Sequence, residues 1–360
     1  MALRDINSTR IAKIAGVSRS TVSKVINDYP SISETTRERV LAAVRRYHYY
    51  PDYSARILAG KKTHTLGLFF ANEGHWSEDL HASRMISAII EHAALCGYHI
   101  LTNIIRTRSD DRSAEVIKEA YYQRRIDGGL FVGFRNHESV VEELIAEGFV
   151  VGAFDQDLPG REEPNRIVVN FDDRNSAAAA IDYLAGLGHR AIAVVNGDRS
   201  RNAGRAKYEG YLLGLERNGL EVRDDWMLFA DFSRPSGFDT MQHFLSREPE
   251  LPTAVAAVND SVAFGVIEAL TRAGLRVPQD VSVVGMDGHV LGSYFRPPLT
   301  TFAFDFGTML EALVGAVVNA IEHPERATHY RGIFPARLIE RESCAAPSSS
   351  STISAPVHKE

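Results

Sequence analysis

Ten short apolar runs, most of them separated by helical patterns, constrain the fold of this chain more than any other feature. Representative runs are TLGLFF at 65–70, GGLFVGF at 128–134 and VSVVGMD at 281–287. Stretches such as AAAAIDYLAGL and FGVIEALTRAG carry apolar residues at helical spacing between them. Short buried strands alternating with helices are typical of an α/β fold with a doubly wound parallel sheet. The other runs lie at 98–104, 149–155, 166–172, 190–197, 226–232, 254–260 and 300–305.

Ten runs are more than one ordinary lobe holds, so the pattern predicts two Rossmann-like lobes. The first lobe is expected to begin near His64 and the second near Asn170. Residues 345–360 read AAPSSSSTISAPVHKE. A segment this polar and rich in Ser and Pro cannot bury a core, so we expect it to be disordered.

The charge of the chain is distributed unevenly. Residues 1–62 carry 12 Lys and Arg against 5 Asp and Glu, a net charge of +7, whereas the whole chain carries −6. Residues 63–360 therefore carry −13. A basic N-terminal module on an acidic body indicates a polyanionic partner for that module alone.

The basic module reads as three helices. STRIAKIA at 8–15 has helical spacing and can be capped by Asn7 or Ser8, and Gly16 allows a tight turn. A second helix opens at Ser18, and a third covers 34–47. A helix, a glycine turn and a short helix form a helix-turn-helix, whose second helix lies in the DNA major groove.

The start of the second helix is expected to face DNA bases. Arg and Lys side chains can pair with the acceptors of guanine, whereas hydroxyl groups near helix starts suit phosphate contacts. The candidate base-facing residues are Arg19, Ser20, Thr21, Ser23 and Lys24, and the candidate phosphate contacts are Ser18, Thr21 and Thr36. The alternative is an ordinary solvated helix face.

Residues 11–62 resemble the DNA-binding headpiece and hinge of the LacI/GalR family. The matching stretches are AGVSRSTVSKVIND, SISETTRERV, a Tyr-Tyr-Pro sequence and ARIL. The resemblance implies that Arg19 and Ser20 occupy variable base-reading positions and that Lys24 and Asn27 make further contacts. Many members have Arg where this chain has Lys24, and a point charge reads a base less strictly than a planar fork.

The resemblance also implies a hinge at 51–63 that follows a headpiece at 1–50. In the family such a segment folds on the operator and wedges a Leu into the minor groove, which kinks the duplex. Leu58 matches that Leu, and Ala55 and Arg56 match its neighbours. A linker that packs Leu58 against the core is the alternative. One headpiece contacts few bases, so the family uses two on a palindrome, which predicts a homodimer.

The core from Thr65 to Cys344 is similar to the family's periplasmic-binding-protein-like effector domain, on stretches such as AVNDSVAFGVIEALTRAGLRVPQDVSVVGMDG. In that fold the chain crosses between lobes three times. The resemblance implies a core at 64–344, with one lobe at about 64–168 and 303–330. The other lobe would cover about 169–302 and 331–344.

Polar residues at strand ends are the candidate effector contacts, because ligands of open α/β sheets bind at the carboxyl ends of strands. They are Asp155, Asn196, Asn259, Asp260 and Asp287. Three of them have a structural alternative: Asp260 could cap the helix that follows it, and Asp155 and Asn196 could tie loops together.

The resemblance adds four more residues. It implies that Arg201 and Lys207 face the cleft, that Phe232 forms an aromatic wall, and that Asp287 binds ligand hydroxyls. Phe304 stands where some sugar-binding members have a polar residue. Carboxylates and cations around an aromatic face suit a small sugar-like effector. His75, Trp76 and His81, in the segment 71–81, are further candidates without an assigned position.

Two other classes of protein are weighed against a regulator. An enzyme would need a catalytic pattern, and the chain has no G-x-S-x-G, Walker A, H-E-x-x-H or Cys/His metal spacing. Asp155 and Asp287 could still form an opposed carboxylate pair. A secreted sugar-binding protein is opposed by the basic headpiece and by an N-terminus without an apolar signal region. We therefore expect a cytoplasmic, non-enzymatic repressor without cofactor, metal or membrane segment.

Overall fold

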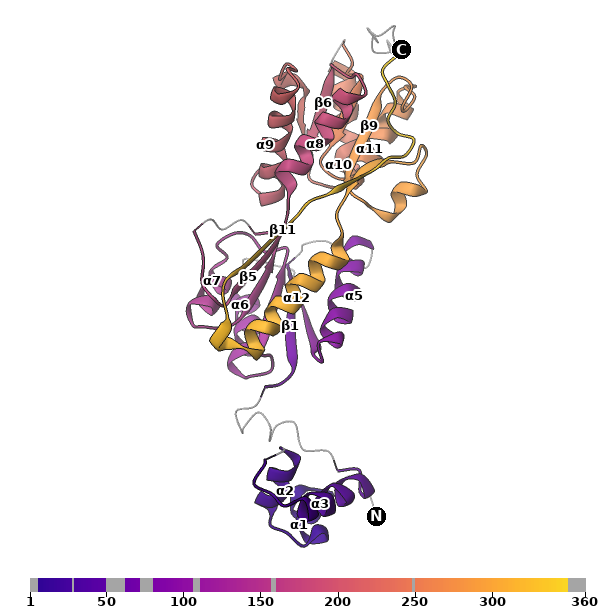
Figure 1. Cartoon of the computed structure of the whole chain (residues 1–360). Helices are drawn as coiled ribbons and strands as arrows, with labels where there is room; N and C mark the ends of the chain where they lie inside the picture. The colour runs from indigo at the N-terminus through magenta and orange to yellow at the C-terminus, as the bar shows by residue number, and fades with distance from the viewer. Residues whose placement is uncertain are drawn as a thin grey trace. The chain divides into compact units, whose positions relative to one another are not determined.

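The computed structural model describes residues 6–27, 29–49, 62–71, 80–105, 111–156, 160–247 and 250–348. The chain divides into two compact units, residues 1–64 and 65–360, which are drawn in Figure 1. Each unit has a hydrophobic core of its own and is described by itself.

The first unit consists of three helices: α1 (Ser8–Ala15), α2 (Arg19–Ile26) and α3 (Glu34–Arg46). Ile11, Val22 and Val40 come from one helix each and are fully buried in a common small core. The three helices and their bounds agree with the helical patterns in the sequence to within about one residue at each end.

The second unit contains two six-stranded sheets, one in each lobe. The first sheet has the order β11-β5-β4-β3-β1-β2 and is parallel throughout. Its elements are β1 (Thr65–Ala71), α5 (Leu80–Leu95), β2 (His99–Ile105), α6 (Asp111–Tyr122), β3 (Gly128–Val132), α7 (Ser139–Ala146), β4 (Val151–Phe154), β5 (Arg166–Phe171), α12 (Phe306–Glu322), η5 (Pro324–Arg326) and β11 (Tyr330–Phe334).

Side chains alternate along β1 because successive strand residues point to opposite faces of the sheet. Leu66 and Leu68 pack in the core cluster that contains buried residues of α5 and α12, whereas Phe69 packs with those of α6 and α7. Figure 1 shows α12 and α5 beside each other, and the two helices are in contact. The sheet is therefore covered on both faces, as a parallel sheet requires.

The second sheet has the order β12-β10-β9-β8-β6-β7, and only β12 runs antiparallel to its neighbour. Its elements are α8 (Asp173–Gly186), β6 (Ile192–Asn196), α9 (Asn202–Arg217), η3 (Asp224–Trp226), β7 (Met227–Phe229), α10 (Arg234–Arg247), β8 (Ala254–Ala257), α11 (Asp260–Arg272), β9 (Ser282–Asp287), η4 (Val290–Ser293), β10 (Thr300–Ala303) and β12 (Arg337–Ile339). None of the described helices is long and apolar enough to cross a membrane.

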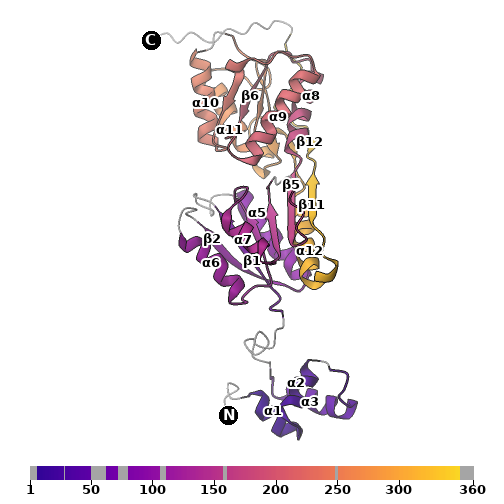
Figure 2. The ribbon, with the colours of Figure 1, turned by 90° about the vertical axis from the view of Figure 1, so that its left-hand side faces the viewer.

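The chain crosses between the two lobes three times, after β5, after β10 and after β11. The sequence-based boundaries at 168 and 330 fall too early, because β5 stays in the first sheet to Phe171 and β11 to Phe334. The reason is edge pairing: β11 lies along β5 and satisfies its backbone groups from Ile167 to Phe171. Figure 2 shows β5 and β11 side by side.

The C-terminal segment is held to the second lobe beyond Cys344. The Ala345 carbonyl accepts hydrogen bonds from Ser282 Oγ at 3.1 Å and is 2.9 Å from His189 Nε2, and Ala345 N donates to Ser282 Oγ. The expectation of disorder from residue 345 onward is therefore wrong for 345–348. Residues 349–360 lie outside the described part of the chain.

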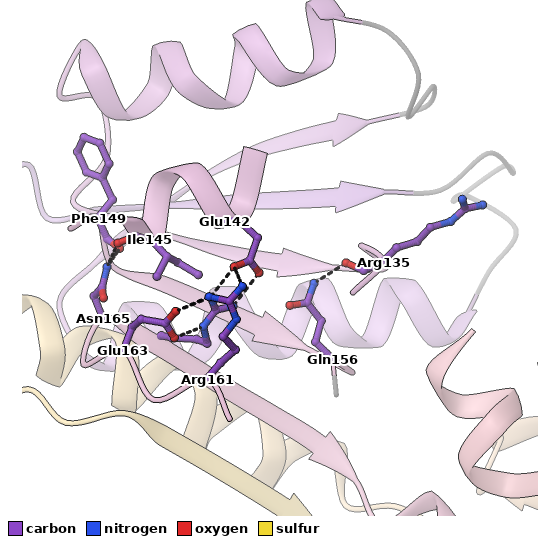
Figure 3. Close-up of polar contacts among 9 residues, drawn as sticks. Arg135, Glu142, Ile145, Phe149, Gln156, Arg161, Glu163 and Asn165 are labelled. Carbon is purple, nitrogen blue, oxygen red and sulfur yellow. Dashed lines mark hydrogen bonds and ion pairs between the residues drawn. The ribbon is translucent and has the colours of Figure 1, made fainter. Parts of the chain in front are cut away.

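An ion network fastens α7 to the start of β5. The Arg166 guanidinium is 2% exposed and donates two hydrogen bonds to the Glu142 carboxylate and two to Glu163. Arg161 lies within 3.7 Å of Glu142 and 3.2 Å of Glu163. Beside them, Asn165 donates to two carbonyls near the end of α7 (Figure 3). These contacts neutralise a buried cation and add hydrogen bonds to the Ile145 carbonyl of α7 and the Phe149 carbonyl just beyond it.

Candidate functional site

The helix-turn-helix is built by local capping. Asn7 Oδ1 accepts a hydrogen bond from the Arg10 amide at 3.0 Å, which decides between the two caps expected for α1. Gly16 ends α1 with φ 62°, in the left-handed region that favours glycine. Ser18 then caps α2 by accepting from the Thr21 amide at 3.1 Å. The two helices are thus separated by a turn of three residues, Gly16 to Ser18.

The candidate base-contacting residues lie on the exposed side of α2. Arg19, Ser20, Ser23 and Lys24 are exposed, whereas Val22 and Val25 of the same helix are buried. The structure therefore brings the four polar residues together on one face of a short helix.

Other hydroxyl and amide groups near this face already have partners within the unit. Arg19 Nε donates to Ser8 Oγ at 3.0 Å, and the Ser18 hydroxyl contacts those of Ser20 and Thr21. Asn27 donates to Ser23 Oγ at 3.3 Å. Thr36 lies in the first turn of α3 and accepts a hydrogen bond from Ser33. Ala55, Arg56 and Leu58 of the hinge lie outside the described residues.

In the second unit, a buried lysine gathers the carboxylates at the strand ends. Lys207, on α9, is 4% exposed, and its Nζ donates to the Val258 carbonyl at 3.0 Å. The same Nζ lies 3.4 Å from Asp173 Oδ1 and 3.6 Å from Asp287 Oδ1. Burial lowers the pKa of Lys207, but the charges of Asp173 and Asp287 outweigh it and the net shift is upward.

Asp155 belongs to the same group of charges. It follows β4 in the first lobe with φ 60°, and its Oδ1 accepts a hydrogen bond from Asn202 at the start of α9. Burial and the charge of Asp173 together raise the pKa of Asp155 to about 7. Asp155 therefore contacts the second lobe, and two of the strand-end residues predicted from sequence, Asp155 and Asp287, lie around one lysine.

Asn259 caps α11, which is the role that the sequence analysis considered for Asp260. Asn259 Oδ1 caps α11 by accepting from the Val262 amide at 2.8 Å, and its Nδ2 donates to the Phe232 carbonyl. Asp260 does not cap the helix: it is 1% exposed and accepts hydrogen bonds from Thr301 Oγ1 and the His289 amide. Burial and Asp287 raise the pKa of Asp260 to about 8.

The aromatic candidates occupy two places. Phe232 has φ 73° and its ring lies against Gly197, where a Cβ would be 2.2 Å from the ring; the Arg201 guanidinium lies 5.6 Å from the ring centroid. Phe304 is buried and packs on Phe171 with centroids 4.5 Å apart. The Phe232 ring is thus a wall flanked by a cation, and Phe304 belongs to the packing between β5 and β10.

Several residues of this region escaped the sequence analysis. Asp173 and Tyr211 are buried beside Lys207, and Asn202 bonds Asp155. The signal for Asp173 was its place just after the run 166–172, at a strand end. Asn196 donates hydrogen bonds to the carbonyls of Gly197 and Gly204. It therefore connects neighbouring backbone segments, which is the structural alternative considered for it. His75 and Trp76 lie outside the described residues, as does the side chain of His81.

Comparisons with known proteins agree with this architecture. The family model "Bacterial regulatory proteins, lacI family" matches residues 9–52, and "Periplasmic binding protein-like domain" matches 181–344. The ribose operon repressor of Escherichia coli K12 is 31% identical over 333 residues, covering 92% of this chain and 98% of that protein. The HTH-type transcriptional repressor PurR of Serratia proteamaculans is 32% identical over 353 residues, covering 93% of this chain and 96% of that protein.

Solved structures give the same picture. A lac repressor dimer bound to operator and the anti-inducer ONPF aligns with a TM-score of 0.79 at 26% identity, covering 95% of this chain and 99% of that one. A complex of the regulator CelR with cellobiose aligns with a TM-score of 0.71 at 25% identity, covering 94% and 99%. A helix-turn-helix followed by a two-lobed parallel-sheet core defines a class of transcriptional regulators. Within that class, the chain belongs to the lacI family of bacterial regulatory proteins.

Proposed function

We propose that this chain is a repressor that binds a palindromic operator as a homodimer and responds to a small effector bound in the core. The observation that carries the proposal is the exposed polar face of α2, with Arg19, Ser20, Ser23 and Lys24 on a helix whose other side is buried. Arg19 and Lys24 supply the donors that read guanine in the major groove. The net charge of +7 on residues 1–62 adds attraction to phosphates.

Residues 51–63 are proposed as the hinge. Leu58 is proposed as the minor-groove wedge, and Ala55 and Arg56 as its neighbours at the DNA. Two hinges of a dimer would meet at the centre of a palindrome, where a kinked step brings both headpieces onto their half-sites. The dimer and its operator are supported by the lac repressor structure, which is a dimer bound to operator.

The proposed effector site is the group around Lys207, with Asp155, Asp173 and Asp287 as polar contacts and Phe232 and Arg201 at its side. The carboxylates accept hydrogen bonds from ligand hydroxyl groups, as a polyhydroxy compound offers. The cellobiose complex of CelR supports the general class. Effector binding would act through its different affinity for the two lobe arrangements that favour or oppose operator binding.

Binding without turnover is part of the proposal. The relatives of this chain are transcriptional repressors. A regulator needs to bind its effector but not to convert it chemically. Its place of action is the compartment that holds the operator DNA, the bacterial cytoplasm.

Selection of bound sequences from random duplex DNA, at two salt concentrations, tests the function. The full chain is expected to enrich a palindrome with a flexible central step, such as a pyrimidine–purine step. The Leu58→Ala variant is expected to lose most operator affinity while its stability stays unchanged. Sequence-blind, salt-sensitive binding by the full chain would contradict the proposed repressor, and equal operator affinity of the variant would contradict the wedge.

A further inference from the structure

The group around Lys207 carries more negative than positive charge. Asp155, Asp173 and Asp287 contribute three carboxylates, and Lys207 contributes the one ammonium within reach of Asp173 and Asp287. Asp173 is 3% exposed and Lys207 4%, so water screens neither of them well. An uncompensated carboxylate in such a place is costly unless a cation or a proton joins it.

Lys207 makes one hydrogen bond and two ion-pair contacts. An ammonium group has three N–H donors, and Nζ faces three acceptors: the Val258 carbonyl at 3.0 Å, Asp173 at 3.4 Å and Asp287 at 3.6 Å. Asn202 supplies one donor to Asp155. One ammonium group is therefore shared between two carboxylates, and Asp155 receives its printed hydrogen bond from a neutral amide.

Asp173 and Tyr211 are left with polar atoms that the described part of the chain does not satisfy. Asp173 Oδ1 lies in the ion pair with Lys207, but within those residues neither oxygen of Asp173 accepts a hydrogen bond, and the fully buried Tyr211 hydroxyl makes none there. Tyr211 lies close enough to feel the charges of Lys207, Asp173 and Asp287. Burial raises the pKa of Asp173 to about 6, as expected for a carboxylate short of donors.

Because buried polar groups are almost always satisfied, these atoms need a hydrogen-bond partner from outside the described residues. We propose that the effector carries a protonated nitrogen, an ammonium group on a polyhydroxy frame such as an amino sugar, which Asp173 binds together with Asp155 or Asp287. An ammonium supplies three N–H donors and the missing positive charge in one group, and charge-assisted hydrogen bonds are the strong ones. The inference rests on the proposed effector site. The proposal excludes phosphorylated or carboxylated effectors, because the negative charge of such an effector would be repelled by the three carboxylates.

The charge argument is tested first without any ligand. Asp173→Asn in the full chain removes the unbalanced charge, so the unfolding temperature at pH 8 is expected to rise by about 2 °C. Asp172→Asn is the matched control: Asn also caps a helix, and the charge of Asp172 acts on Asp173 more weakly than those of Lys207 and Asp287, so its unfolding temperature is expected to change less than that of Asp173→Asn. A fall for Asp173→Asn would show that Asp173 is a structural partner of Lys207, and it would overturn the proposal.

The ligand class is tested by thermal shift with matched compounds at equal concentration. The panel holds glucosamine, galactosamine and mannosamine, each with its parent sugar, its N-acetyl derivative and its 6-phosphate. An amino sugar is expected to raise the unfolding temperature more than its three counterparts, and Asp173→Asn is expected to remove that preference. Preference for a parent sugar, an N-acetyl derivative or a phosphate would overturn the proposal, as would a panel without any shift. None of these outcomes touches operator selection, so failure of the ligand class and failure of the repressor function are distinguishable.

Discussion

Asn202 donates a hydrogen bond from Nδ2 to Asp155 Oδ1 at 3.1 Å, and the two residues belong to different lobes of the core. Asp155 follows β4 of the first sheet, whereas Asn202 opens α9 beside the second sheet. The bond therefore ties the position of one lobe to that of the other. Because Asp155 also lies near Lys207 and Asp173, the charge of the effector site and the contact between lobes depend on the same carboxylate.

The first prediction is a pH dependence of stability that originates at Asp155. Its pKa is raised from 3.8 to about 7, so between these values the folded chain holds a proton that the unfolded chain has lost. Stability is therefore expected to fall as pH rises through this interval, by up to about 1.4 kcal/mol per pH unit for one such group. Urea unfolding at pH 5, 6, 7 and 8 measures the slope.

Asp155→Asn is expected to reduce that slope, and Asp173 and Asp260, whose pKa values are also raised, supply the part that remains. Asn tolerates the left-handed backbone of this position, and its carbonyl oxygen still accepts the hydrogen bond from Asn202. Only the titrating proton is lost. Equal slopes for the two proteins would show that Asp155 does not titrate in this range and that another group causes the dependence.

The architecture was largely predictable because buried parallel strands leave a continuous apolar pattern. All ten runs are strands in the structure. Their ends were less predictable, as the run 226–232 shows: β7 covers only Met227–Phe229, because Phe232 turns to φ 73° and leaves the strand. The change of lobe was predicted near this point, but its exact position after Phe171 was not, since it depends on pairing with β11, more than 150 residues later.

The candidate site was predictable only in part. Strand-end position predicted Asp155 and Asp287, and the family resemblance added Lys207. Whether Asn259 or Asp260 caps α11 depends on a shift of one residue that the sequence does not determine. Tyr211 was missed because an aromatic residue at helical spacing indicates a core position equally well. That its hydroxyl has no hydrogen-bond partner among the described residues becomes visible only when α8 and α9 are packed together.

The second prediction concerns that packing. Gly210 of α9 lies against α8, where a Cβ would be 2.1 Å from the Arg174 carbonyl oxygen and 2.8 Å from Ala177 Cβ. Gly210→Ala is therefore expected to push the helices apart and to lower the free energy of unfolding by about 1–3 kcal/mol. Lys207 lies one turn away, so the effector site is expected to loosen as well.

Gly315→Ala provides the control for that substitution. Gly315 lies in the exposed part of α12, and its Cβ would meet no atom within 4 Å. Because alanine favours a helix more than glycine does, this variant is expected to gain about 0.5–1 kcal/mol. Chemical denaturation of both variants measures the difference, and a loss of equal size in both would contradict the close contact between α8 and α9.

The third prediction concerns Arg166, which is buried between Glu142 and Glu163. Arg166→Leu leaves both carboxylates without their main partner and is expected to cost about 3 kcal/mol. The hydrogen bond from Arg166 holds the pKa of Glu163 near 2, so this stabilisation is present above pH 4.5 and lost as pH falls toward 2. The cost of the substitution should therefore shrink in acid.

Arg161→Leu is the matched control, because Arg161 contacts the same two carboxylates from an exposed position. Exposed ion pairs contribute little, so its cost is expected to stay below about 1 kcal/mol. Thermal unfolding of both variants at pH 7 and pH 3 tests the ranking. Equal costs for the two arginines at pH 7 would show that burial does not decide the strength of this network.

The last prediction assigns a role in DNA binding to a single side chain. Arg19 opens the exposed face of α2, its Nε donates to Ser8 Oγ at 3.0 Å, and its two terminal nitrogens carry the other four N–H donors of the guanidinium. A fork in this place can pair with N7 and O6 of one guanine. Arg19→Ala is therefore expected to cost about 1–3 kcal/mol in operator affinity and to relax the preference at one base pair of each half-site.

Arg45→Ala, which removes an equal charge from the exposed end of α3, is expected to weaken binding to all sequences alike and to reduce the salt dependence of binding. Binding of both variants to the selected operator and to single-base variants of it separates these outcomes. A uniform loss for Arg19→Ala would mean that Arg19 binds a phosphate and that Ser20, Ser23 or Lys24 reads the base.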